Sequence, residues 1–95
     1  MWTEAFDLHS HSTNSDGEHP VADVAKMMAE SKVRFWSLTD HDTISGWSSA
    51  KQAAESEGLG FIPGVEISTN EGFHILCYFK KIDFMLFRLS RMMIR

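Results

Sequence analysis

The stretch Val33-Arg34-Phe35-Trp36-Ser37-Leu38-Thr39-Asp40-His41-Asp42, written VRFWSLTDHD, decides the fold. Its first seven residues are rich in apolar, aromatic and β-branched side chains and predict a strand. Asp40, His41 and Asp42 then give this strand a polar end, and Thr43 offers a cap for a following helix. We therefore expect a strand that leads from a core into a cluster of polar side chains.

Helices are predicted on both sides of this strand. From Val21 to about Lys32, apolar residues recur at helical spacing, and Pro20 suits the first helical position. The second predicted helix begins after Thr43 and runs to about Glu57, where Gly58 ends it.

The remaining segments predict further strands. Ala5 to His11 alternates between apolar and polar residues, so that His9 and His11 should point the same way. Residues 59–62 and 65–68 predict a strand interrupted by Pro63-Gly64, and a turn at residues 70–72 precedes a last strand at 73–79. The order β-α-β-α-β-β predicts an α/β fold with a parallel sheet, in which chemistry gathers at the carboxyl ends of the strands.

Composition narrows the class of protein. A chain of 95 residues allows one domain at most, and no stretch reaches the roughly 18 apolar residues of a membrane span. The start lacks the features of a signal peptide, and a single Cys77 excludes a disulfide framework, which favours a reducing cytoplasmic location. Residues 1–79 carry four basic and twelve acidic side chains, a net charge of −8, so a groove for duplex nucleic acid is not expected.

Histidines and a carboxylate at three predicted strand ends indicate a metal site. His9 and His11 end the first strand, His41 ends the second, and Glu66 lies late in the third. Imidazole and carboxylate ligands together suit Zn²⁺, Mn²⁺ or Fe²⁺, and a carboxylate can bridge two ions. Closely spaced metals clamp phosphate esters and activate water, so we expect phosphoester hydrolysis. The nearby carboxylates of Asp7, Asp40 and Asp42 are candidates to orient the ligating imidazoles rather than to ligate.

Several of these residues also have plain structural interpretations. Asp16 could be only the Asp of an Asp-Gly turn, and His74 could simply sit at a strand edge. Glu66 as a purely structural residue would be a buried carboxylate without an evident basic partner, which favours its role as a ligand. His19 is expected to be solvated, and Trp47 is expected in the core, with an alternative place at the rim of a pocket.

The motifs that carry these residues resemble the PHP superfamily, the polymerase and histidinol phosphatase domains. The similar segments are DLHSHSTNSDG at 7–17, LTDHD at 38–42, PGVEIST at 63–69 and HILCYF at 74–79, so the resemblance covers essentially residues 5–79. It implies a distorted (β/α)₇ TIM-like barrel with a trinuclear metal centre and phosphoesterase activity. It also implies that His9 and His11 bind one metal, that Asp16 and His41 bind another, that Glu66 bridges and that His74 holds the third. Glu66 and His41 would thus serve catalysis through metal ligation.

The Asp-Gly ending of the first motif is most similar to stand-alone PHP phosphoesterases that act on nucleotides or short oligonucleotides. Family members continue into further β/α units, which supply another His and a closing Asp-x-His pair, and neither occurs after Phe79 in this sequence. We therefore expect residues 1–79 to be the N-terminal part of a PHP domain, truncated and with weak or no turnover alone. Residues 80–95 predict an apolar, basic, helical tail that has a net charge of +4 and is atypical for the family.

Two other classes of function stay open at this stage. In the first, the metals brace a non-catalytic module that pairs with a polymerase or another partner, and the apolar tail docks on that partner or closes a homo-oligomer. In the second, the activity is similar to that of histidinol phosphatases. A membrane-surface role for the tail is disfavoured, because its helical projection lacks a clean polar face.

Overall fold

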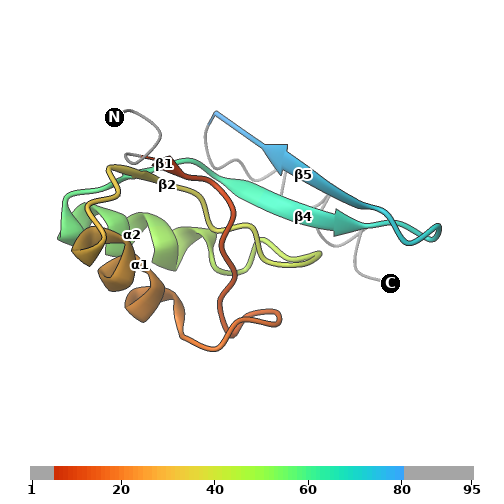
Figure 1. The fold of residues 1–95 in the computed structure, drawn as a ribbon, viewed down its shortest axis with the longest axis horizontal. Coiled ribbons are helices and arrows are strands. Elements are labelled where there is room, and N and C mark those ends of the chain that lie inside the picture. Colours follow the sequence, from red (N-terminus) through yellow and green to blue (C-terminus); the bar gives the residue numbers. More distant parts are fainter. Residues whose placement is uncertain (1–5, 81–95) are drawn as a thin grey trace.

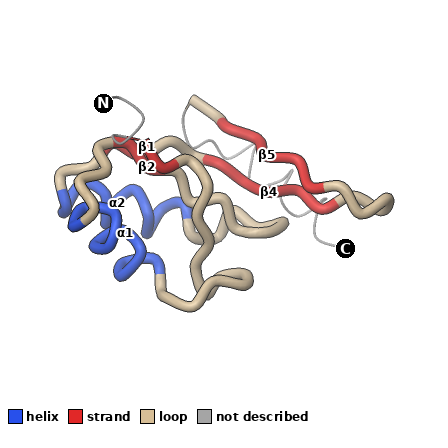
Figure 2. Tube along the Cα trace, viewed as in Figure 1, coloured by secondary structure: helices blue, strands red, loops and turns tan. Residues whose placement is uncertain are grey.

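A computed structural model describes residues 6–80, which form a small parallel sheet, two helices and a β-hairpin (Figures 1 and 2). In chain order the elements are β1 (Phe6–Asp7), α1 (Val21–Glu30), β2 (Phe35–Trp36), α2 (Trp47–Glu57), β3 (Gly60–Phe61), β4 (Gly64–Ser68) and β5 (His74–Tyr78). Neither described helix is long and apolar enough to cross a membrane.

The first three strands form a parallel sheet in the order β1-β2-β3, connected through α1 and α2. Phe35 in β2 pairs with Phe6 on one side and Gly60 on the other. Both helices lie on the same side of this sheet, next to each other (Figure 1). The predicted α/β class is therefore confirmed, and β2, the central strand, lies inside the stretch at 33–42.

A core of apolar side chains fixes the helices to the sheet. Its buried members are Val21, Val24, Ala25, Val33, Trp36, Leu38, Ala50, Ala54 and Leu59. The fully buried alanines of both helices have little side-chain volume, which lets α1 and α2 approach closely. Trp36 fills the space between helices and sheet and donates its indole N–H to Ser10 Oγ at 2.8 Å. The core thus holds the segment that follows β1 in place.

The hairpin of β4 and β5 is antiparallel and projects beyond the parallel sheet (Figure 1). It is attached by a single parallel bridge between His41 and Glu66, in which Glu66 N donates to Asp40 O and Asp42 N donates to Glu66 O. Trp47 adds a second link by donating its indole N–H to Gly64 O at 2.7 Å. These bonds place the polar end of the central strand directly beside β4.

Three elements, β1, β2 and α2, are shorter than the sequence predicts, and the strand expected at residues 33–39 is regular only at Phe35–Trp36. β1 is shorter than predicted because Ser37 N bonds Asp7 O and Thr39 N bonds Ser10 O, so the first segment advances one residue more than the second and the ladder breaks. The second helix begins at Trp47, because Thr43 Oγ1 accepts the N–H of Ser45 and folds a turn there. The helix ends at Gly58, as predicted.

The predicted strand across residues 59–68 is two strands in two different sheets, because Pro63 separates β3 from β4. The turn before β5 is confirmed, with Gly72 at φ 86°. Within residues 6–80 the strands do not close into a barrel. Except for Lys80, the predicted tail at 80–95 lies outside the described residues, as does the predicted start of the first strand at Ala5.

Candidate metal centre

Glu66 lies at the centre of the polar cluster. It is on β4, is only 7% exposed, and has four imidazoles around its carboxylate. Oε1 lies 2.9 Å from His9 Nε2 and 2.8 Å from His11 Nε2, and Oε2 lies 3.0 Å from His74 Nδ1. His41 Nδ1 is more distant from Oε2, at 3.9 Å. His9 and His11 therefore point the same way, as the sequence predicts.

Asp16 forms the second side of the cluster. Its two oxygens lie 2.7 Å from His11 Nδ1 and 3.1 Å from His41 Nε2. The loop reaches this position because Gly17 packs on the backbone of His11, where an added Cβ would come within 2.5 Å of His11 O. The carboxylate itself is mostly exposed, with 62% of its side-chain surface accessible. Asp16 thus belongs to an Asp-Gly turn and also lies beside two imidazoles.

Three overlapping groups could each hold one metal ion. They are His9 with His11 and Glu66, His11 with Asp16 and His41, and His41 with Glu66 and His74, with ligand atoms within 4.8 Å of one another. Two ligand atoms that each lie about 2.1 Å from one ion are at most about 4.2 Å apart, so modest adjustment suffices. Mixed nitrogen and oxygen donors suit Zn²⁺, Mn²⁺ or Fe²⁺. The donor set fits the metals that the sequence predicts.

The two carboxylates at the centre have lowered pKa values. Burial raises the pKa of Glu66, but hydrogen bonds from His9 and His11 and the charges of His41 and His11 outweigh it, and the net pKa lies below the ordinary value. For Asp16, desolvation likewise raises the pKa, but the charges of His11 and His41 and the hydrogen bond with His11 outweigh it, and the net pKa lies below the ordinary value. Both side chains are therefore anionic at neutral pH, which is the form that ligates a cation.

Asp7, Asp40 and Asp42 have partners other than the imidazoles that we expected them to orient. Asp7 accepts the backbone N–H of His9, and Asp42 accepts that of Ser68 at 2.7 Å. Asp40 is buried and accepts three hydrogen bonds from the loop at 12–15. These carboxylates accept hydrogen bonds from the backbone and the loop around the cluster, because the N–H groups at the strand ends need acceptors.

Sequence reasoning missed three side chains near the cluster. Ser12 and Ser15 both bond Asp40, and Tyr78 donates its hydroxyl to Leu8 O. Burial, and then the negative charges of Asp7 and Glu66, raise the pKa of Tyr78, which keeps the phenol protonated. Side chains alternate between the two faces of β5, so Tyr78 lies on the same face as His74. This alternation, visible in the sequence, would have identified Tyr78 as a neighbour of the cluster.

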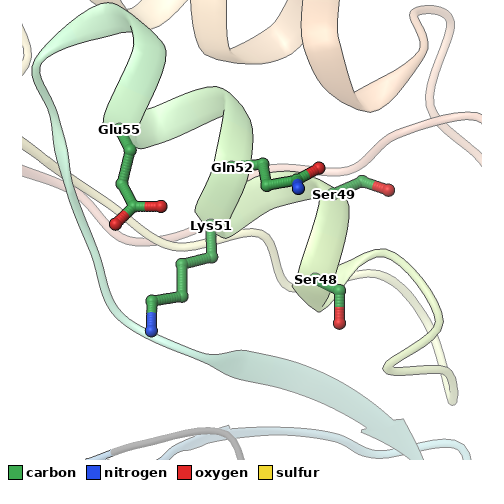
Figure 3. Close-up of a pocket in the computed structure, with 5 residues that line it drawn as sticks. All are labelled: Ser48, Ser49, Lys51, Gln52 and Glu55. Carbon is green, nitrogen blue, oxygen red and sulfur yellow. The ribbon is translucent and has the colours of Figure 1, made fainter.

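The other predicted residues lie as expected. His19 is exposed, and Trp47 is buried in a second core cluster with Ile44 and Val65. A separate shallow pocket on α2 is lined by Ser48, Ser49, Lys51, Gln52 and Glu55 (Figure 3). None of these five residues belongs to the three groups that could hold a metal.

Comparisons with known proteins agree with this arrangement. The chain is 43% identical over 77 residues to a 5'-3' exoribonuclease of Haemophilus influenzae, which covers 78% of the chain and 28% of that relative. It is 40% identical over 69 residues to a 3',5'-nucleoside bisphosphate phosphatase of Chromobacterium violaceum, covering 73% of the chain and 24% of the relative. The chain therefore spans about a quarter of the length of these relatives.

A solved structure from Bifidobacterium adolescentis, provisionally described as a metal-dependent phosphoesterase, matches with a TM-score of 0.70 and 30% identity. The match covers 77% of the chain and 27% of that structure. The family model for the PHP domain matches residues 7–93, which include every residue of the polar cluster. The chain belongs to the PHP domain family.

Proposed function

We propose that this chain carries the N-terminal part of the metal centre of a hydrolase, a metal-dependent phosphoesterase that acts on phosphate esters of nucleotides or short oligonucleotides. The two relatives described above are named for exoribonuclease and nucleoside bisphosphate phosphatase activities, and both names denote hydrolysis of phosphate esters. Their sequence similarity covers about three quarters of this chain and supports the same class of reaction.

The observation that carries the proposal is the environment of His11. Its Nδ1 lies 2.7 Å from Asp16 and its Nε2 lies 2.8 Å from Glu66, so both ring nitrogens face carboxylate oxygens. A neutral imidazole has one N–H, so only one of the two ring nitrogens can donate a hydrogen bond. The lone pair of the other nitrogen would face a lone pair of a carboxylate oxygen. Either a second proton or a metal cation must lie between this nitrogen and the carboxylate. The imidazoles of His9, His41 and His74 nearby favour a metal cation.

We assign His9 and His11 to one divalent metal, Asp16 and His41 to a second, and His74 to a third, with Glu66 as the bridge. Zn²⁺, Mn²⁺ and Fe²⁺ are the candidates, with up to three ions in a complete site. Bound metals would neutralise the ester phosphate and make water nucleophilic at neutral pH. The buried Glu66 would fix the spacing of its neighbours, and the exposed side of Asp16 and His74 would leave room for substrate.

His11, His41 and Glu66 each belong to two of the three groups. The six residues of the groups therefore cannot fill three metal sites completely. Glu66 has two oxygens and can serve two ions, but an imidazole ordinarily binds one. We therefore expect weak or no turnover from the chain alone. A cytoplasmic location is part of the proposal, because the sole cysteine, Cys77, is unpaired.

The test measures bound metal and phosphoester hydrolysis together. We expect purified protein to carry Zn, Mn or Fe by elemental analysis, and His9→Ala to reduce bound metal by roughly tenfold or more. His19→Ala is the matched control, since His19 is an exposed histidine outside the three groups. Activity is measured with a 3',5'-nucleoside bisphosphate on a version extended to the length of the relatives. Hydrolysis by protein stripped of metal would contradict the proposal.

A second candidate is a metal-braced module without catalysis, paired with a polymerase, another partner or a second copy. Exposed apolar side chains on β5 favour it, since Ile75 is 50% exposed and Leu76 is 38% exposed. Under this alternative, metal raises thermal stability and the extended version binds metal fully but hydrolyses no ester. An activity like that of histidinol phosphatases would be distinguished from the main proposal by testing the substrate of those enzymes beside the nucleoside bisphosphate.

A further inference from the structure

A buried carboxylate lies beneath the exposed loop that carries Asp16. Asp40 is 2% exposed, and within residues 6–80 it forms no ion pair. Its charge is met by three short hydrogen bonds, since Oδ1 accepts from Ser12 N at 2.6 Å and Ser15 Oγ at 2.7 Å, and Oδ2 accepts from Ser12 Oγ at 2.7 Å. A buried charge is costly without such partners, so the loop and Asp40 stabilise each other.

The loop closes on Ser12, which is itself fully buried. Ser15 N and Gly17 N both donate to Ser12 O, at 3.0 and 2.9 Å, and Asn14 N donates to Ser12 Oγ at 3.1 Å. Asp16 is therefore flanked by two residues whose positions depend on the Ser12–Asp40 contact. Its own side chain extends outward to His11 and His41.

Asp40 also connects the loop to the other side of the cluster through the backbone. It directly precedes His41, and its carbonyl accepts the N–H of Glu66 at 3.2 Å. The side chain of Asp40 thus fixes Asp16, while its backbone fixes His41 and Glu66. No other described carboxylate is bonded to both segments in this way.

We propose that Asp40 is a positioning residue that holds the loop of residues 12–17 so that Asp16 stays between His11 and His41. It would act on Asp16, His11 and His41 and leave His9 and its contact with Glu66 largely unaffected. The inference rests on the proposed metal site for its consequence in affinity, but the positioning itself is measurable without metal.

Two substitutions separate geometry from charge. In Asp40→Asn, the amide oxygen can accept from Ser12 N and Ser15 Oγ, and the amide N–H can donate to Ser12 Oγ, so the loop keeps its anchor. In Asp40→Ala, three donors lose their acceptor. Ser15→Ala removes a single bond and serves if Asp40→Ala fails to fold.

The first experiment uses the metal-free full chain and reads the imidazole ¹⁵N signals by NMR. We expect Asp40→Ala to shift the signals of His11 and His41 in the same direction as Asp16→Asn, with the signal of His9 little changed. Ser15→Ala should give a smaller shift of the same kind, and Asp40→Asn should resemble the wild type. Unchanged His11 and His41 signals in both Asp40→Ala and Ser15→Ala would overturn the inference.

The second experiment titrates the same variants with Mn²⁺ and measures affinity. We expect Asp40→Ala to weaken one binding step by about 10- to 100-fold, as outer partners of ligands commonly do, and Asp40→Asn to stay within about threefold of wild type. In the Asp16→Asn background, Asp40→Ala should add almost nothing, because both act on one group. Fully additive effects, or equal losses in Asn and Ala variants, would overturn positioning. Absence of Mn²⁺ and Zn²⁺ binding by wild type would instead refute the proposed function, while the NMR result would still decide the positioning.

Discussion

Glu66 combines two properties that are rarely found together, burial and a lowered pKa. Removal of a carboxylate from water disfavours its charge, yet hydrogen bonds from His9 and His11 more than compensate. Glu66 is therefore an anion that is surrounded by imidazoles. Its charge contributes to the stability of the metal-free fold and would serve the proposed ligation of metal.

The lowered pKa of Glu66 predicts a pH dependence of stability. The group contributes stability above its unfolded pKa, with an ordinary value of 4.5, and this contribution is lost as the pH falls through the lower folded pKa. Glu66→Gln should therefore destabilise the metal-free protein at about pH 6 and have a smaller effect at about pH 3. Urea unfolding at both pH values measures this difference. Glu71→Gln, at an exposed turn, is the control and should show no such change.

At the scale of elements, the site depends on segments that leave the regular ladder. The chain after β1 gains one residue relative to β2, and the loop at 12–17 then folds back toward His11. Regular pairing would keep these side chains on fixed alternate faces. The irregular segment instead brings His11 and Asp16 to the same centre.

Gly17 is the position at which this loop is most sensitive to substitution. An added Cβ would lie 2.5 Å from His11 O and 2.7 Å from Ser12 N, both of them backbone atoms that cannot move freely. Gly17→Ala should displace Asp16, destabilise the fold by about 1 to 3 kcal/mol and weaken metal binding. Thermal unfolding and Mn²⁺ titration test this expectation. Glu18→Ala, at the exposed neighbouring residue, should leave both measurements near wild type, and an unaffected Gly17→Ala would contradict the steric argument.

At the scale of the whole molecule, β5 is the border of the described structure. It pairs with β4 on one side, and Phe73, Ile75, Leu76 and Tyr78 on or next to it are exposed. The region matched by this chain is only about a quarter of the length of its relatives. An apolar strand at the edge of a sheet is a ready template for association.

We expect the purified chain to self-associate through this edge as its concentration rises. Ile75→Lys should lower the apparent mass measured by light scattering at high concentration, because a charged lysine opposes pairing at an edge strand. Met27→Lys changes an exposed apolar residue on α1 and should leave the mass unchanged. A mass that does not respond to Ile75→Lys would show that another surface drives association.

The sequence alone determined the order of strands and helices, the end of α2 at Gly58, and the six residues of the polar cluster. These features are local, because hydrophobic period, turn residues and ligand-rich motifs are visible in short windows. The sequence could not determine the separation of β3 from β4 into different sheets or the partners of Asp40. Pro63 marks the break in the sequence, but the sheet that each strand joins and the partners of Asp40 depend on long-range hydrogen bonds. Those from Trp47 to Gly64 and from Ser12 to Asp40 join residues far apart in the chain. Only the tertiary structure decided how the four histidines meet around Glu66, because that depends on where the segments pack and not on their composition.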